Sequence, residues 1–185
     1  LCRALADRGH RVQPFQKGPD YIDPMWLARA ARRPCYNLDF NLTDAAGLRE
    51  LFARHAGAAD LSIVEGNKGL HDGLALDGSN SNAALARTLG APVVLVVDTR
   101  GITRGIAPLR LGYHAFDPEV RIGGVIFNQV GGSRHGSKLR QAVEHYTDIP
   151  VLGSVQAAAE MAITERHLGL VPSNEADAAD AQVAR

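Results

Sequence analysis

Apolar runs alternate with amphipathic stretches along most of this 185-residue chain. The runs 61–64, 92–98 and 124–128 are short, rich in β-branched residues and almost free of polar side chains, as is typical of strands covered on both faces. Between them lie stretches of about ten residues whose apolar positions recur at helical spacing. This alternation predicts an α/β fold, a doubly wound and mainly parallel sheet with helices on both faces.

The same pattern gives the order and bounds of the elements. The predicted strands are 12–15, 61–64, 92–98, 124–128, 151–155 and 168–171. The predicted helices are 1–9, 24–33, 43–55, 82–89, 106–116 and 133–146. Pro24 at a helix start, Asp44 at an N-cap and Gly9 and Gly90 after helix ends support these bounds. No repeat or linker interrupts the chain, so we expect one domain over residues 1–185.

Composition narrows the classes of function. Lys+Arg and Asp+Glu number 20 each, so no net field favours nucleic acid or an anionic membrane surface as a partner. No apolar run reaches the roughly 18 residues that a membrane span needs. Neither the two cysteines nor the seven histidines show zinc-site spacing, so we assign no transition metal. We expect a reduced, cytoplasmic setting.

The stretch 17–24 (KGPDYIDP) is the densest cluster of candidate chemistry. It holds one cation, two carboxylates and an aromatic ring, and its prolines restrict the backbone. We expect it to form a stiff loop after strand 12–15, where an α/β protein usually places its site. A solvated turn is the simpler alternative, because Gly, Pro and Asp are ordinary turn residues.

Polar residues also end the other predicted strands, at Glu65, Asp98 and Asn128. The carboxyl ends of parallel strands meet at one edge of a sheet, so these side chains should lie near Asp20 and Asp23. Several carboxylates at one edge repel each other. Mg²⁺, which is usually held by one or two carboxylates plus phosphates, would relieve the repulsion, and we predict a magnesium–nucleotide site.

A phosphate-binding loop is the part that the sequence does not supply. No G-x-x-x-x-G-K-[ST] motif is present, and 66–69 and 131–133 are weak glycine-rich candidates. A P-loop lies between a first strand and a first helix, and the chain opens in such a helix. We therefore expect the P-loop and its strand to precede Leu1.

Five blocks, in order and over nearly the whole chain, resemble the N-terminal synthetase domain of cobyrinic acid a,c-diamide synthases. The blocks are 17–24 (KGPDYIDP), 65–73 (EGNKGLHDG), 90–98 (GAPVVLVVD), 124–131 (GVIFNQVG) and 165–175 (ERHLGLVPSNE). The resemblance implies a P-loop fold like that of dethiobiotin synthetase. It also implies an ATP-dependent carbon–nitrogen ligase, in which ATP converts tetrapyrrole side-chain carboxylates into acyl phosphates and ammonia then gives the amides.

The resemblance has consequences for the extent of the domain. The ammonia would come from a C-terminal glutamine amidotransferase domain, which these residues lack. A domain without that partner and without its P-loop is expected to be inactive by itself. The resemblance also admits a homodimer.

Site roles follow from the matching positions. Lys17 would neutralise phosphate oxygens, Asn128 would read the nucleotide base, and Asp20 and Glu65 would hold Mg²⁺. The catalytic set that positions the substrate carboxylate or the ammonia would be Asp20, Tyr21, Asp23 and Asp72. Three simpler roles stay open: a solvated surface lysine for Lys17, a backbone cap for Asn128, and a helix cap rather than a supporting role for Asp98.

The loop after Glu65 departs from the family pattern, with Asn67, Lys68 and His71 at positions that are often apolar. Lys68 and His71 could meet carboxylates of the macrocycle or simply face water. Ser79, at the opening of a helix, could bind an anion or act as an ordinary cap. This altered loop keeps sirohaem, or another sirohydrochlorin-type ring, as the alternative substrate.

Two other classes compete with the ligase. One is a P-loop ATPase switch that works on a protein or DNA partner, against which the balanced charge and the 17–24 block argue. The other is a module that binds the tetrapyrrole without catalysis.

Overall fold

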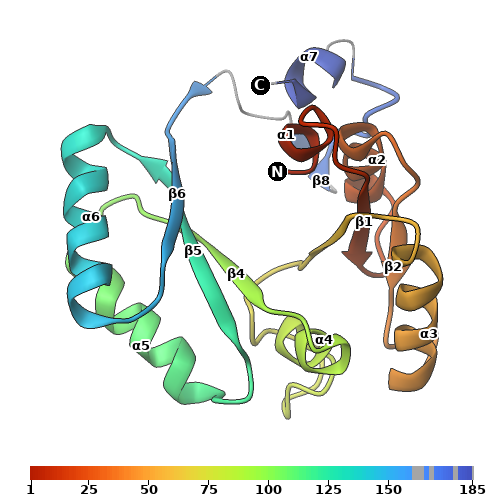
Figure 1. Cartoon of the computed structure of the whole chain (residues 1–185), viewed down its shortest axis with the longest axis horizontal. Helices are drawn as coiled ribbons and strands as arrows, with labels where there is room; N and C mark the ends of the chain where they lie inside the picture. Colours follow the sequence, from red (N-terminus) through yellow and green to blue (C-terminus); the bar gives the residue numbers. More distant parts are fainter. Residues whose placement is uncertain (160–164, 167–168, 177–178, 185) are drawn as a thin grey trace. The chain divides into compact units, whose positions relative to one another are not determined.

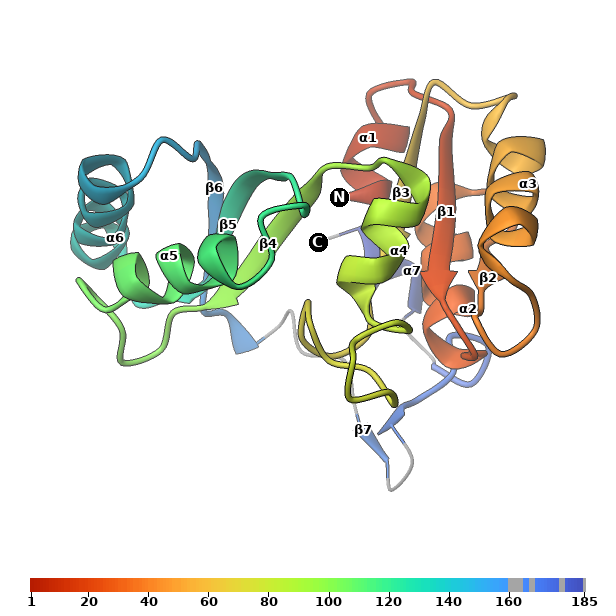
Figure 2. The same ribbon diagram turned by 90° about the horizontal axis from the view of Figure 1, so that it is seen from below.

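A computed structural model describes residues 1–159, 165–166, 169–176 and 179–184. Residues 1–89, with the described part of 160–185, form one unit, and residues 90–159 form another. Each unit contains its own parallel sheet, and helices pack on these sheets (Figures 1 and 2).

The first unit is built on three parallel strands in the order β2-β1-β3. The strands are β1 (Val12–Lys17), β2 (Tyr36–Leu38) and β3 (Leu61–Glu65). The helices that accompany them are α1 (Cys2–Ala6), α2 (Ile22–Ala31), α3 (Ala45–Ala56) and α4 (Asn82–Leu89). The central strand β1 is buried along its whole length.

Side-chain alternation along β1 divides the core of this unit into two layers. Phe15 packs with Leu48 of α3 and Leu85 of α4. Val12 packs with Cys2 of α1 and with Ala31 at the end of α2. Since adjacent strand residues point to opposite faces, and Val12 and Phe15 differ by an odd number of positions, the sheet is covered by helices on both faces.

The described C-terminal residues add a short antiparallel pair, β7 (Glu165–Arg166) with β8 (Gly169–Leu170), and α7 (Ala179–Val183). Two contacts hold this segment to α2. The indole Nε1 of Trp26 donates to the carbonyl oxygen of Val171 (2.9 Å). Arg29 pairs with Asp180 (2.9 Å).

The second unit has the strand order β4-β5-β6, again all parallel. Its strands are β4 (Val93–Asp98), β5 (Ile122–Val130) and β6 (Val151–Gln156), and its helices are α5 (Ile106–Phe116) and α6 (Ser133–Tyr146). Val125 and Phe127 of β5 and Leu139 and Val143 of α6 are almost fully buried. The polar face of α6 is left to solvent, as its amphipathic pattern predicts.

The predicted α/β class with parallel strands and helices on both faces is confirmed. That these elements form one domain over 1–185 stays a prediction. Among the described residues, no helix combines the length and the apolar character that crossing a membrane requires.

Two local predictions are wrong. Lys17 belongs to strand β1 rather than to the loop after it, because Gly18 N still bonds the carbonyl of Leu38 (3.0 Å) and prolongs the pairing of β1 with β2. The helix predicted from Pro24 begins at Ile22, with proline in its first turn, where no intrahelical N–H is needed. The strand β2 was not predicted, and part of the predicted strand 168–171 lies outside the described residues.

Replacing Trp26 by Phe should lower the free energy of unfolding by about 1–3 kcal/mol, because the buried Val171 carbonyl loses its donor. Equilibrium urea unfolding measures the change. Arg29→Gln is the matched control on the same helix. Its partner Asp180 is exposed, so the loss should stay below about 1 kcal/mol. Equal effects of the two substitutions would mean that Trp26 does not anchor the C-terminal segment.

Candidate functional site

The carboxyl edge of the first unit's sheet gathers most of the predicted site residues. Asp20 follows β1 and precedes Tyr21, the N-cap of α2, and its Oδ1 accepts hydrogen bonds from the backbone N–H groups of Ile22 (2.9 Å) and Asp23 (3.3 Å). Its carbonyl oxygen accepts a hydrogen bond from Asn37 Nδ2 on β2 (2.5 Å). These contacts fix Asp20 at the entrance of α2, where a negative charge also suits the helix dipole.

Three carboxylates influence one another at this edge. Although part of Glu65 reaches the surface, burial of its carboxyl group and the charges of Asp23 and Asp20 raise its pKa to about 7. Burial and the charge of Asp20 also raise the pKa of Asp23. The acids are therefore close enough to oppose each other's ionisation, which is the situation that a bound divalent cation relieves.

These carboxylates suit magnesium only if the phosphates of a substrate supply the rest of its coordination shell. Within the described ranges, no three His, Cys, Asp or Glu side chains come together as a metal-binding group. Magnesium, however, is commonly held by one or two carboxylates with substrate phosphates completing its shell. Asp20 and Glu65 as its protein ligands stay a prediction.

Lys17 is not a solvated surface residue. It is 9% exposed, and its Nζ donates to Asn67 Oδ1 (3.3 Å), while Asn67 Nδ2 donates back to the Lys17 carbonyl (3.3 Å). Burial lowers the pKa of Lys17; the charge of buried Asp39 acts against this shift and that of Lys68 adds to it. A buried ammonium with one weak partner is suited to an anionic ligand.

The loop between β3 and α4 is held by amide side chains. Asn82 Nδ2 donates to the carbonyls of Asn67 and Gly69 on either side of Lys68, whose φ is +58°. Gly66 lies against the same side chain, so that an added Cβ would come within 2.8 Å of it. The direction of Lys68 is thus set by packing on Asn82.

The other predicted loop residues have local roles in this structure. Asp72 Oδ2 accepts a hydrogen bond from Gly69 N (3.1 Å), and Ser79 N donates to Asp77 Oδ1 (2.9 Å). His71 is partly buried, and Tyr21 is 70% exposed beside the acids. Their catalytic and substrate-binding roles stay predictions.

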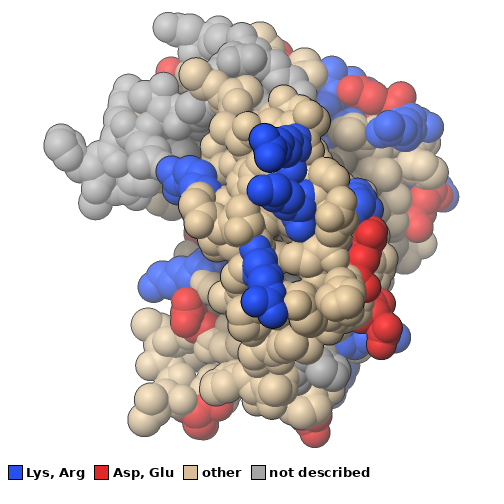
Figure 3. Space-filling model, turned by 90° about the vertical axis from the view of Figure 1, so that its left-hand side faces the viewer, with Lys and Arg blue, Asp and Glu red and all other residues tan. Residues whose placement is uncertain are grey.

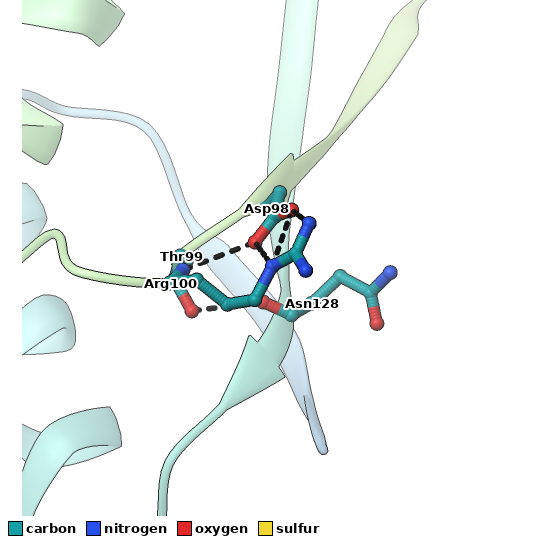
Figure 4. A network of polar contacts seen from close by, with 4 residues as sticks. All are labelled: Asp98, Thr99, Arg100 and Asn128. Atoms are coloured by element: carbon teal, nitrogen blue, oxygen red, sulfur yellow. Dashed lines mark hydrogen bonds and ion pairs between the residues drawn. The ribbon is translucent and has the colours of Figure 1, made fainter. Parts of the chain in front are cut away.

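Asn128 and Asp98 lie in the second unit, at the carboxyl ends of β5 and β4 (Figure 4). The Asp98 carboxylate is engaged by Arg100, through its backbone N–H and its guanidinium, which lowers the pKa of Asp98. The backbone carbonyl of Asn128 accepts both the N–H (3.0 Å) and the hydroxyl (2.8 Å) of buried Thr99. The Asn128 side chain points away from this group and makes no hydrogen bond within the described chain, so it is not the predicted cap.

The weak glycine-rich candidate 131–133 borders a cavity in this unit. The cavity has a volume of about 180 Å³ and lies between the first turns of α6 and the ends of β5 and β6. Its polar side chains are those of Ser133, Ser137, Arg140, Ser154 and Gln156.

A basic stripe crosses the side of the molecule on which α5 and α6 lie (Figure 3). Arg104 and Lys138 line a shallow groove there, and the Arg104 guanidinium donates to Tyr146 Oη (2.8 and 3.1 Å) and covers its ring. Because the whole chain has balanced charge, this is a local feature rather than a net field.

Sequence reasoning missed the amides that connect the site, namely Gln16 and Asn37, together with Asp39 and Thr99. A polar residue in a buried strand is the signal that could have found Gln16.

Comparison with known proteins identifies the family of the chain. A family model described as an AAA domain matches residues 20–162. The chain therefore belongs to this AAA domain family, and the match runs through both units.

Curated relatives give a narrower class of protein than the family model does. The chain is 50% identical to "Cobyrinate a,c-diamide synthase" of Magnetococcus marinus over 175 aligned residues. The alignment covers 95% of this chain and 38% of that protein. Proteins of the same name from Methanosarcina acetivorans (44% identity; 95% of this chain, 36% of that protein) and Listeria monocytogenes serotype 4b (45%; 95% and 39%) also match. The predicted resemblance is confirmed, and the chain spans about two fifths of the length of these relatives. Their names do not favour the sirohaem alternative.

Replacing Glu65 by Gln should raise the unfolding temperature in the absence of Mg²⁺, by an amount that depends on pH. The Glu65 pKa is about 7 in the fold against 4.5 for an unperturbed glutamate, so its contribution to stability is lost as pH rises from about 4.5 through 7. Glutamine does not titrate. Because Glu65 is partly exposed, we expect a gain of about 1 kcal/mol, or about 2–4 °C, above pH 7 and almost none at pH 4.5. Calorimetry between pH 4.5 and pH 7 measures the gain in unfolding temperature. An equal gain at both pH values would contradict the raised pKa of Glu65.

Proposed function

We propose that this chain is the synthetase part of an ATP-dependent amide ligase that acts on side-chain carboxylates of a tetrapyrrole, with cobyrinic acid as its substrate. The observation that carries the proposal is the group of Asp20, Asp23 and Glu65, in which the charge of Asp20 raises the pKa of the other two acids. Buried Lys17 ends β1, the strand that Asp20 follows. The relatives' shared name supports the choice of macrocycle.

The chemistry requires activation of a poor electrophile. A substrate carboxylate oxygen attacks the γ-phosphorus of ATP, giving an acyl phosphate and ADP; ammonia then attacks the carbonyl carbon, phosphate leaves and an amide is formed. Phosphoryl transfer depends mainly on positioning and on charge neutralisation. Magnesium would supply neutralisation of the phosphate charge. Asp20 and Glu65 would hold it, while Lys17 would neutralise phosphate oxygens.

The remaining side chains would orient the two partners of the second step. Tyr21, Asp23 and Asp72 would position the substrate carboxylate or the ammonia. Lys68, His71 and Ser79 would contact the macrocycle, and Asn128, whose amide is unengaged in the described chain, would read the base. A glutamine amidotransferase domain would supply the ammonia. Both units would belong to one synthetase domain, which the single family match through both of them supports.

The full gene product, supplied with Mg²⁺, ATP and ammonia, should release ADP only when a tetrapyrrole carboxylate is present, and one amide should appear per ADP. Coupled-enzyme detection of ADP with mass spectrometry of the macrocycle measures both, with sirohaem as the comparison substrate. Sustained ADP release without macrocycle would instead indicate an ATPase switch. Macrocycle binding with no ADP release would indicate a binding module.

Replacing Asp20 by Asn should lower kcat by at least about 100-fold with little change in unfolding temperature. Asparagine removes the charge but keeps the side-chain oxygen that accepts hydrogen bonds from the first N–H groups of α2. Asp44→Asn makes the same change at the cap of α3, where Asp44 Oδ1 accepts from Gly47 N (2.9 Å), and should leave kcat unaltered. An unaltered kcat in Asp20→Asn would remove Asp20 from the metal site.

A further inference from the structure

Gln16 is a fully buried amide that makes no hydrogen bond. It lies on β1, is 0% exposed, and neither Nε2 nor Oε1 has a partner in the described part of the chain. Gln13 on the same strand is 2% exposed, yet its Nε2 donates to the carbonyls of Pro34 (2.8 Å) and Pro14 (3.0 Å). Buried amides are nearly always hydrogen-bonded, so Gln16 calls for an explanation that Gln13 does not.

The strand register shows what lies beside Gln16. It is paired with Asn37 of β2 on one side and with Glu65 of β3 on the other. Paired residues of neighbouring parallel strands carry their side chains on the same face, about 4.8 Å apart. Asn37, Gln16 and Glu65 therefore form a polar row across the sheet.

The row is only partly hydrogen-bonded. Asn37 Nδ2 already donates to the carbonyl oxygen of Asp20, whereas its Oδ1 is buried and has no partner in the described chain. The register places Gln16 between Asn37 and Glu65, and its Nε2 carries two hydrogens. After a rotation of its side chain, this one donor group could serve two acceptors, Asn37 Oδ1 and the Glu65 carboxylate.

We propose that Gln16 is a positioning residue for Glu65. When Glu65 holds a divalent cation, Gln16 Nε2 donates one hydrogen to the Glu65 carboxylate and the other to Asn37 Oδ1. The polar row then connects Glu65, through Gln16 and Asn37, to the backbone of Asp20. Of the buried polar atoms of Gln16 and Asn37, Oε1 of Gln16 then stays without a donor in the described part of the chain.

This inference rests on the proposed function, in which Asp20 and Glu65 hold Mg²⁺. Hydrogen bonds to a metal-binding carboxylate orient it, and their loss typically costs about 10–100-fold in metal affinity. The row would fix two ligands that come from different segments, the turn after β1 and the end of β3.

Replacing Gln16 by Met keeps the length of the side chain and removes both hydrogen-bonding groups. In the full gene product with ADP present, Mg²⁺ should bind about 10–100-fold more weakly by titration calorimetry. Without Mg²⁺ the unfolding temperature should rise by about 2–4 °C, because an unpartnered buried amide is lost. Gln13→Met is the matched control: it should lower the unfolding temperature and leave the Mg²⁺ affinity unaltered.

A second comparison tests whether Gln16 acts through Glu65. In a Glu65→Gln background, Gln16→Met should weaken Mg²⁺ binding no further. A further loss of tenfold would overturn the inference, as would a lowered unfolding temperature with unaltered Mg²⁺ affinity in Gln16→Met. If wild type and Gln16→Met bind Mg²⁺ equally tightly, the inference alone fails. If the wild type does not bind Mg²⁺ with ADP, the proposed function fails and takes this inference with it.

Discussion

Repulsion among the carboxylates of Asp20, Asp23 and Glu65 is the constraint on which the first unit's site depends. The fold imposes it: α2 holds Asp20 by its terminal N–H groups, and pairing with β1 fixes the end of β3. Burial and the charge of Asp20 raise the pKa values of Asp23 and Glu65, so ionisation of these two groups reduces the stability of the fold. An amide in place of any one of them would reduce that cost. A divalent cation bound by these carboxylates would offset the cost.

Strand β1 carries an unusual number of polar side chains for a buried parallel strand. Val12 and Phe15 supply packing on its two faces, while Gln13, Gln16 and Lys17 bring polar atoms into the interior. Their hydrogen bonding grows poorer toward the carboxyl end: Gln13 is satisfied, Lys17 has one partner at 3.3 Å, and Gln16 has none in the described chain. Within its six residues, β1 thus changes from side chains that pack in the core to side chains whose polar groups lie at the candidate site.

The parts that could be predicted from the sequence are those with a local signature. Strand β4 has a long β-branched run, and the acids at strand ends follow from the geometry of parallel sheets. Strand β2 has only three residues, too few for a period to show. Lys17 was assigned to a loop because Gly18 and Pro19 follow it, but pairing with β2 keeps it in the sheet. The neighbours of Gln16 depend on register between distant segments, which no local pattern contains.

Charge at this sheet edge is segregated rather than mixed. Asn82 holds the carbonyls on both sides of Lys68 and so keeps that residue at a positive φ that side chains other than glycine seldom adopt. Burial lowers the pKa of Lys17, and the charge of Lys68 adds to this shift, while the charge of buried Asp39 acts against it. Ion pairs between the two lysines and the three acids would stabilise the charges of both sets. Within the described residues, however, Lys17 and Lys68 form no salt bridge with Asp20, Asp23 or Glu65. Glu65 is paired with Gln16, the strand neighbour of Lys17, so Lys17 and Glu65 point to opposite faces of the sheet, and this separates the lysine from the acid.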